Sequence, residues 1–399
     1  MEILTQFYFS AMSAASLYIV FYLTFVVRKP KIIAKPGSFI YRLIKQRCPF
    51  ATELYWPTIW CYGGRAQTVV GGVLKSHPVV TYEREILGTR DGGEIALDWC
   101  NTKNSTNPLT VLILPGLTGT SQLGYVLHFV LHVTQKLNCA VVVLNNRGLG
   151  GLQLKTPRVC CAADTEDLEY VISHLKNKQP RRPVMVAGIS LGGIILTNFL
   201  CKMAEGKSDI TDEILGAAII STPWDLFKTS NSLEQPLNRL LFNRHLTKLL
   251  QNVLKEHLSS TKFQEMTLKL NCDINSGLNS STVREFDDKI IAPMSGFKDC
   301  NEYYAAATLH TKPLCKINIP LLCLNAADDP FAPEESIPFE LLSRCPNIAM
   351  VLTKHGGHVG FTEGLFPRGA GLMEKVIVQY SQALFEHWSQ GRHDSSLMN

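Results

Sequence analysis

The first group in the sequence that could do chemistry is a serine between two glycines. Ser190 lies in the pentapeptide 188–192, Gly-Ile-Ser-Leu-Gly, directly after the apolar run 184–187. Where a buried strand turns abruptly into a helix, small neighbours let the backbone fold tightly around a strained serine, and its hydroxyl stands exposed. The pattern predicts a nucleophile elbow with Ser190 as the nucleophile, although short Gly/Ser patterns also occur by chance in loops.

The histidine that would activate Ser190 is expected further along the chain. A serine hydroxyl is a weak nucleophile, so it needs a histidine to take its proton and an acid to orient that histidine. The chain order behind such an elbow is serine, acid, histidine. His358 lies in the glycine-rich stretch 355–361 after the last predicted strand and is the preferred base. His355 is too close to the end of that strand to reach inward, and we expect it to be an exposed loop residue.

Two adjacent aspartates compete for the role of the acid. Asp328 and Asp329 both follow the apolar run 321–325, which we interpret as a strand. An acid at this place is commonly followed by a hydrophobic residue and a proline in the pattern Asp-x-φ-x-Pro, which selects Asp329 through Phe331 and Pro333. Asp328 stays the alternative, and its other role would be to cap the next turn.

Acyl transfer also needs two backbone amides that face the developing negative oxygen. One is the amide of Leu191, which follows the nucleophile; the other is expected in the loop 115–119, with Leu117 as the best candidate. Arg147, in a loop after another predicted strand, is expected to brace loops near the site rather than to bind substrate. This chemistry requires no metal and no organic cofactor.

Composition limits the class of protein. The chain has 399 residues, of which 46% are hydrophobic and 18% charged, which is sufficient for a large buried core. The net charge of +5 comes without a Lys/Arg run, so a nucleic-acid partner has little support. The twelve cysteines show no zinc or disulfide spacing, and we expect mostly reduced thiols. The oligomeric state stays open.

An uncharged apolar run from Phe7 to Val27 begins the chain, and four basic residues follow within residues 28–35. This length suits a single transmembrane helix, and the basic flank behind it favours an uncleaved signal-anchor over a signal peptide. The expected location is a membrane, crossed once, with the endoplasmic reticulum as a candidate. The flank favours a cytosolic catalytic domain, whereas glycosylation sequons at Asn104 and Asn279 would matter only in the lumen, so the orientation stays open.

The rest of the chain is expected to position these groups. Strands predicted at 109–115, 139–145, 184–189, 215–221, 319–325 and 348–352, after a hairpin of 80–87 and 94–99, alternate with helices near 121–137, 164–178, 191–205, 334–343 and 369–388. Such alternation predicts a mostly parallel sheet covered by helices on both faces. Between anchor and hairpin the chain reads as irregular, and Trp56, Trp60 and Tyr62 either lie at lipid headgroups or pack on the main domain.

A long, mostly helical insertion after residue 222 is expected to form a cap over the site. Its apolar residues Leu237, Leu240, Leu241 and Phe242 either border an acyl chain or pack onto the core. The predicted organisation is an anchor with its basic flank (1–35), a juxtamembrane lead-in (36–79), two core parts (80–222 and 313–390) around the cap (223–312), and a polar tail (391–399).

Five motifs, 114–119, 145–148, 188–193, 327–331 and 356–361, occur in one order, and the anchor, the Tyr55-Trp56-Pro57 lead-in and the capping insertion accompany them. Together they resemble the YheT-like branch of the α/β-hydrolase-domain proteins. The similarity covers most of the chain and is greatest to the single-pass membrane phospholipase and esterase members of animals. The resemblance implies an α/β-hydrolase fold and a membrane lipid substrate, most of all phosphatidylcholine-type phospholipids.

The expected function is that of a serine hydrolase that draws a lipid from the bilayer and cleaves its carboxylic ester through an acyl-enzyme on Ser190. A carboxylesterase or acylglycerol lipase would share the same catalytic residues and differ in its acyl pocket. A non-enzymatic scaffold of the same fold is the alternative of another class, but such a scaffold usually lacks part of the triad.

Overall fold

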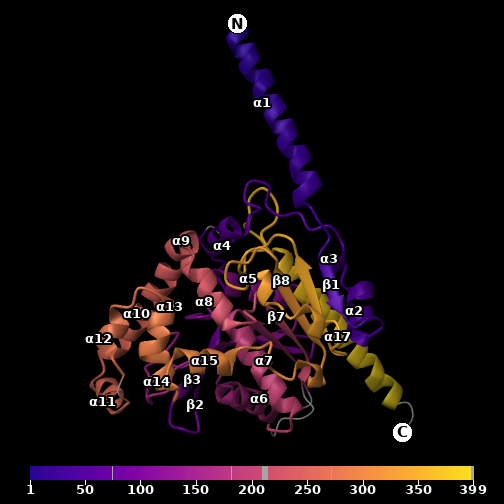
Figure 1. The fold of residues 1–399 in the computed structure, drawn as a ribbon. Helices are drawn as coiled ribbons and strands as arrows, with labels where there is room; N and C mark the ends of the chain where they lie inside the picture. Colours follow the sequence, from indigo (N-terminus) through magenta and orange to yellow (C-terminus); the bar gives the residue numbers. More distant parts are fainter. Residues whose placement is uncertain (74, 181, 209–213, 271, 397–399) are drawn as a thin grey trace.

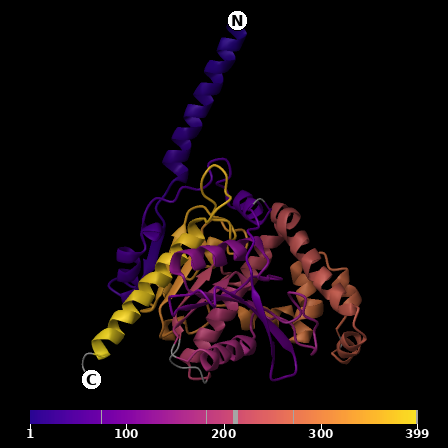
Figure 2. The same cartoon turned by 180° about the vertical axis from the view of Figure 1, so that it is seen from behind.

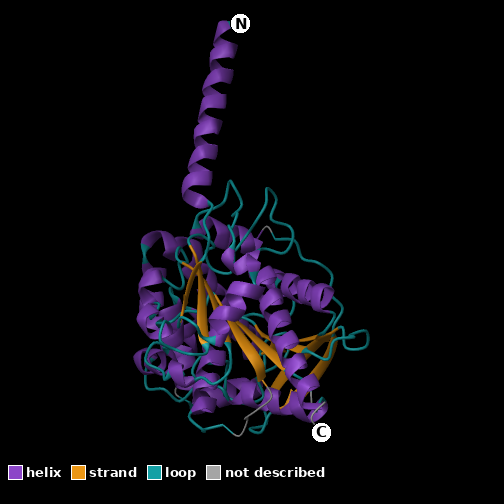
Figure 3. Cartoon of the chain, turned by 90° about the vertical axis from the view of Figure 1, so that its right-hand side faces the viewer, coloured by secondary structure: helices purple, strands orange, loops and turns teal. Residues whose placement is uncertain are grey.

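A single sheet runs through the middle of the molecule between helices (Figures 1 and 3). The computed structural model describes residues 1–73, 75–180, 182–208, 214–270 and 272–396. In this part of the chain nine strands pair in the order β1-β9-β8-β7-β6-β4-β5-β3-β2. They are β1 (Lys31–Ala34), β2 (Glu83–Gly88), β3 (Glu94–Cys100), β4 (Thr110–Leu114), β5 (Ala140–Asn145), β6 (Val184–Ile189), β7 (Ile214–Ile220), β8 (Leu321–Ala326) and β9 (Ile348–Thr353).

The centre of the sheet is parallel. Strands β5, β4, β6, β7, β8 and β9 pair in parallel, and β1, β2 and β3 are added antiparallel at the two ends. The six predicted core strands all form, with ends shifted by two residues at most. They read as continuous apolar runs because both faces of the sheet are covered. The predicted fold class, a mostly parallel sheet between two helical layers, is confirmed.

Alternate residues of the central strands divide the core into two layers, because neighbouring side chains on a strand point to opposite faces. Val111 and Ile113 pack with α2 (Phe39–Arg47), α5 (Gly124–Leu137) and α17 (Leu372–Ser396), whereas Leu112 and Leu114 pack with α6 (Glu166–Lys178) and α7 (Leu191–Ala204). Figure 2 shows α17, in yellow, along the back of the molecule. The sheet is thereby held rigidly, which fixes the loops at its carboxyl edge.

Residues after β7 form the mostly helical insertion that the sequence predicts, on one side of the sheet (Figure 1). Its elements are α8 (Leu226–Glu234), α9 (Pro236–Asn238), the π-helical turn η2 (Arg239–Asn243), α10 (Arg244–Leu258), α11 (Thr261–Lys269), α12 (Ile274–Leu278), α13 (Val283–Phe286), the π-helical turn η3 (Asp287–Ile291), α14 (Ala292–Met294) and α15 (Cys300–Ala307). Buried residues of α10, α13 and η3 join the core layer that contains α7.

The N-terminal helix projects away from the rest of the molecule (Figure 1). It comprises α1 (Glu2–Phe21) and the π-helical turn η1 (Tyr22–Val26), and it is long and apolar enough to cross a membrane. Residues 1–21 are exposed, while Tyr22, Val26 and Val27 are buried against Ile59 and Tyr62. The helix therefore starts before the predicted Phe7, and its last turns attach it to the body.

The prediction of an irregular lead-in is wrong. Residues 36–79 contain α2, α3 (Pro49–Thr52) and α4 (Gly64–Val73), and the basic flank before them contains β1. Ser38 caps the start of α2 by accepting a hydrogen bond from the amide of Tyr41. A serine ahead of an apolar stretch can predict such a helix start. Strand β1 could not be read locally because its partner β9 lies far along the chain.

Two further expectations need correction. The predicted helix 334–343 is instead a 3₁₀ turn, η5 (Glu334–Ser336), and the short α16 (Phe339–Leu342), because Pro338 between them disfavours helix at the residue before it. Cys315, in the 3₁₀ turn η4 (Leu314–Lys316), forms a disulfide with Cys345, although the sequence showed no disulfide spacing. Ten other cysteines are free, so most thiols in the described residues are reduced as expected.

Candidate active site

Ser190 stands at the turn between β6 and α7. Its φ of 54° and ψ of −116° are strained for a residue with a side chain, and its amide donates to the carbonyl of Ile220 at 2.9 Å. The turn can close because a Cβ on Gly188 would lie 2.5 Å from the carbonyl oxygen of Gly192, and one on Gly192 would lie 2.2 Å from that of Leu114. The pentapeptide therefore has the physical form of a nucleophile elbow.

Three predicted side chains meet at this turn. His358 Nε2 lies 2.8 Å from Ser190 Oγ, and His358 Nδ1 lies 2.9 Å from Asp329 Oδ2. Asp329 is buried at 3% exposure, and its Oδ1 accepts the amides of Phe331 and Ala332 at 2.7 and 3.1 Å. These amides fix the carboxylate so that it can orient the imidazole, which in turn can accept the serine proton.

The two predicted amide donors also border the reacting serine. Leu117 and Leu191 line the same cavity as Ser190. Leu191 is the first residue of α7, where amides lack an intrahelical acceptor, and neither amide is hydrogen-bonded to another group of the described chain. Thr118 beside Leu117 has a φ of 55°, which turns this loop. Both amides therefore stay our candidates for the oxyanion hole.

A second aspartate–histidine pair lies next to the first. Asp328 Oδ2 is 3.0 Å from His355 Nδ1, and Asp328 Oδ1 accepts the amide of Gly357 at 2.9 Å. The His355 ring meets the edge of Tyr62 at 5.4 Å between centroids. His355 is therefore a packed residue rather than the exposed one we expected, and Asp328 holds the loop of His358 rather than capping the next turn.

Arg147 braces loops around the site. Its guanidinium is buried and bonds Asp91 of the β2–β3 hairpin at 2.6 Å and Asp167 of α6 at 2.5 Å. The hydrogen bond from Arg147 holds the pKa of Asp91 well below its usual range. Since all its nitrogens are engaged by these partners, the expected bracing role is confirmed.

Several contacts of the site were not found from the sequence. Thr68 of α4 accepts the amide of His358 at 2.8 Å, and Ser221 after β7 accepts that of Val359 at 3.0 Å. Phe331 stacks on the His358 ring at 4.2 Å, and Tyr125 of α5 accepts the amide of Gly116 in the oxyanion loop at 2.9 Å. Only the hydrophobic place in the Asp-x-φ-x-Pro pattern hinted at Phe331; the others come from distant elements.

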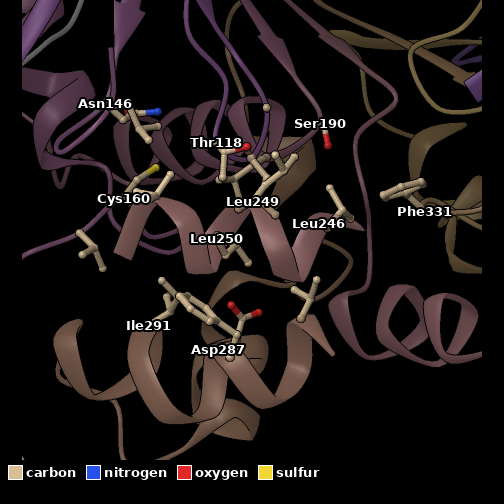
Figure 4. A pocket seen from close by; sticks show the side chains of 18 of the residues that line it. Thr118, Asn146, Cys160, Ser190, Leu246, Leu249, Leu250, Asp287, Ile291 and Phe331 are labelled. Atoms are coloured by element: carbon tan, nitrogen blue, oxygen red, sulfur yellow. The ribbon is translucent and has the colours of Figure 1, made fainter. Parts of the chain in front are cut away.

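A cavity of about 420 Å³ opens beside Ser190, and most of its lining is apolar. Figure 4 shows Leu246, Leu249 and Leu250 of α10 along it, with Ser190 and Asp287 far apart. The predicted leucines Leu237, Leu240 and Leu241 do not line it and are exposed at 50%, 62% and 39%; Phe242 is buried against Phe331. Neither of the two roles considered for the three leucines is correct, since the apolar face of the cap that turns inward belongs to α10.

Asp287 is the one acid among the described residues that line this cavity. It is buried at 8% exposure, and Tyr304 donates to its Oδ2 at 2.9 Å. Burial raises the pKa of Asp287 to about 7, against the smaller lowering effect of the Tyr304 hydrogen bond. The cavity therefore contains, among its mostly apolar side chains, one carboxyl that keeps its proton to a higher pH than an ordinary aspartate.

Comparison with known proteins agrees with this geometry. Residues 105–363, from the segment before β4 to just past His358, match the family described as serine aminopeptidase, S33. The chain belongs to this family. It has the α/β-hydrolase fold and is a serine hydrolase.

The chain is also similar to two curated relatives and to one solved structure. Phospholipase ABHD3 of Homo sapiens is 41% identical, with 93% of this chain and 88% of the relative covered. Monoacylglycerol lipase ABHD2 of Mus musculus is 26% identical, with 90% and 86% covered. The serine hydrolase CCSP0084 of Cycloclasticus zankles is 15% identical, with a TM-score of 0.48 over 77% of this chain and 98% of that one.

Proposed function

We propose that the protein is a membrane-anchored phospholipase that cleaves carboxylic esters of phosphatidylcholine-type phospholipids through an acyl-enzyme on Ser190. The observation that carries this proposal is the Ser190, His358 and Asp329 arrangement at an apolar cavity. The volume of this cavity, about 420 Å³, is within the roughly 300–1,000 Å³ typical of small-molecule sites. The name of the relative Phospholipase ABHD3 supports the same substrate class.

The reaction has two steps. Ser190 Oγ attacks the ester carbonyl while His358 Nε2 takes its proton, and the oxyanion accepts hydrogen bonds from the amides of Leu117 and Leu191. The imidazolium, stabilised by Asp329, then protonates the leaving alcohol. A water activated by His358 cleaves the acyl-enzyme in the same way and regenerates the serine.

The family description names aminopeptidases, which cleave a residue from the N-terminus of a peptide. The cavity favours a different substrate, an ester that carries an acyl chain. An aminopeptidase must bind a charged amine near the scissile bond, which calls for an ionised acid beside the nucleophile. Among the described residues that line it, Asp287 is the one acid, and it lies across the cavity from Ser190 (Figure 4). Leucines occupy the space between, which suits an acyl chain.

The test compares purified wild-type protein with Ser190→Ala on three substrates: dispersed phosphatidylcholine, a monoacylglycerol and a short water-soluble ester. We expect phosphatidylcholine to give the highest kcat/KM and Ser190→Ala to abolish all three activities. Preference for the monoacylglycerol would favour the acylglycerol lipase alternative, which the name of the mouse relative also suggests. Hydrolysis of the short ester alone would favour a carboxylesterase, and no hydrolysis by wild type would favour a scaffold.

We further propose that α1 and η1 form a single-pass signal-anchor. The supporting observations are the apolar helix from Glu2 to Val26 and the exposure of residues 1–21. Because a signal-anchor is inserted at the endoplasmic reticulum, that membrane is the first location to examine. Deletion of residues 1–21 keeps β1 and the packing of Tyr22, and we expect it to release the protein on alkaline carbonate extraction, while the full-length chain stays in the pellet.

A further inference from the structure

Large apolar side chains are exposed on three segments on the side of the molecule from which α1 projects (Figure 1). They lie in the lead-in (Trp56 and Trp60), in the loop after β9 (Leu365 and Phe366) and at the start of the cap (Leu237, Leu240 and Leu241). Phe366 is 70% exposed, Leu240 62% and Leu365 58%. Exposed apolar side chains on neighbouring segments commonly mark an interaction site. We call these seven residues the rim.

The three segments are bonded to one another and to the helix that leaves the body. Pro57 pairs with Glu363 in an isolated bridge, and the Trp60 indole donates to the Leu365 carbonyl at 2.7 Å. Arg65, at the start of α4, donates to Asn238 of α9 at 2.7 Å. The Tyr22 hydroxyl donates to the carbonyl of Pro57. The rim is therefore a fixed surface, and α1 projects from the same side of the molecule (Figures 1 and 3).

Basic residues accompany the apolar ones. The stretch 235–248 of the cap contains Arg239, Arg244 and Lys248, all exposed, and no acidic residue. Arg368 follows Phe366 in the loop after β9 and is also exposed. Apolar side chains that enter the acyl boundary, flanked by cations that meet the phosphates, are the composition of an interfacial membrane contact.

The cavity reaches the surface next to the rim. Of its lining residues, Gly72 at the end of α4, His77 after it, Leu123 ahead of α5 and His245 in the first turn of α10 are exposed. The other end of α4 carries Arg65, whose partner Asn238 lies between Leu237 and Leu240. Helix α4 thus borders both the rim and the path to Ser190.

We propose that the rim is a second membrane contact, with a phospholipid bilayer as its partner. It rests on the leaflet from which α1 emerges and places the opening between α4 and α10 at the lipid surface. A lipid then enters the cavity without crossing bulk water. This proposal extends the proposed phospholipase function, since it assigns how that substrate reaches the site.

The first test measures depth and does not depend on hydrolysis. Full-length protein is reconstituted in vesicles of phosphatidylcholine and phosphatidylserine that carry bromine on the acyl chain close to the ester. We expect bromine to quench a part of the tryptophan fluorescence that is absent in Trp56→Phe/Trp60→Phe. Of the other tryptophans, Trp99 and Trp224 are buried in the protein, and Trp388 lies in α17, which ends on the side of the molecule opposite α1 (Figure 1). Equal quenching of wild type and double variant would overturn the proposal and assign the rim to a protein contact, whether or not the phospholipid is hydrolysed.

The second test separates access from catalysis. Leu240→Ser/Leu241→Ser should lower hydrolysis of vesicle phospholipid roughly tenfold, because each substitution removes apolar side-chain area that would enter the bilayer, and leave hydrolysis of a short soluble ester unchanged. The matched control is Leu268→Ser in α11, 80% exposed at the opposite end of the cap, which should change neither activity (Figure 1). A parallel fall of both activities, or a fall of neither, in the double variant would contradict the proposal. Absence of phospholipid hydrolysis in wild type would instead contradict the proposed function.

Discussion

Two aspartate–histidine pairs lie side by side at the carboxyl edge of the sheet, and they differ in what the other side of each imidazole meets. His358 places Nε2 at 2.8 Å from Ser190, with its ring stacked on Phe331. His355 bears the same kind of contact to an aspartate, but its ring meets the edge of Tyr62. The same pair of residue types can therefore move a proton in one place and fix a loop in the other, and the neighbours decide which.

The largest expected effect separates the two histidines. His358→Ala should lower kcat by about 10⁴-fold and nearly abolish labelling of Ser190 by a fluorophosphonate, because the hydroxyl loses its base. His355→Ala should lower kcat by roughly tenfold at most, because it loosens the 355–361 loop. Labelling is measured on proteins whose far-UV circular dichroism matches wild type. Equal losses in the two variants would mean that the loop, and not the base, was removed.

The aspartates should follow the same order with a smaller difference. Asp329→Asn keeps the shape but reverses the polarity toward His358 Nδ1, and we expect a loss of about 10³- to 10⁴-fold in kcat with little change in KM. Asp328→Asn can still accept the Gly357 amide, so a loss below about tenfold is expected. If the Asp328 variant is the more damaged while its melting temperature is unchanged, the acid has been assigned one residue too late.

Local sequence was sufficient for the central strands and for the three side chains that meet at Ser190. The run 184–189 is apolar throughout because both faces of β6 are covered, and the following glycines admit the tight turn on Ser190. Choosing between Asp328 and Asp329 needed only the order of a hydrophobic residue and a proline behind them. In these stretches the residues that determine the structure are neighbours in the chain.

Where a structure depends on contacts between residues distant in the chain, the local sequence did not predict it. The short strand β1 (Lys31–Ala34) forms because it pairs with the edge of β9. Thr68 contributes to the site because α4 packs against the loop of His358, where the Thr68 hydroxyl accepts the His358 amide. The leucines of the cap could not be placed from local sequence either. Periodicity indicates that a helix has an apolar face, but not whether core, bilayer or solvent lies opposite, and Leu240 was therefore misplaced.

The carboxyl of Asp287, in the cavity, shows what burial does to an aspartate that has no histidine beside it. In the part of the chain that the structure describes, the Tyr304 hydroxyl is the one side-chain hydrogen-bond partner of the Asp287 carboxyl, and burial raises the pKa of Asp287 from 3.8 to about 7. Below pH 3.8 both folded and unfolded chains hold the proton, so this residue contributes no pH dependence there. Between about pH 4 and 7 the folded chain holds more protons than the unfolded one, so the free energy of unfolding falls as pH rises, by roughly 1 kcal/mol per pH unit.

The smallest expected effect follows from this carboxyl. Asp287→Asn removes the cost of ionising a buried group, so the variant should gain stability relative to wild type as pH rises from 5 to 8, with its melting temperature higher by roughly 5 °C at pH 8. The matched control is the adjacent Asp288→Asn. A hydrogen bond from the Cys300 amide and the contact with Lys289 lower the pKa of Asp288. The ionised Asp288 therefore stabilises the folded wild type above the ordinary pKa of an aspartate. Asp288→Asn should lower the melting temperature by the same amount at every pH from 5 to 8. Thermal denaturation followed by circular dichroism at each pH measures both. A loss of stability in Asp287→Asn at pH 8 would show that the carboxylate is ionised and compensated in the fold, and the far end of the cavity would then be suited to a cationic group rather than to an acyl chain.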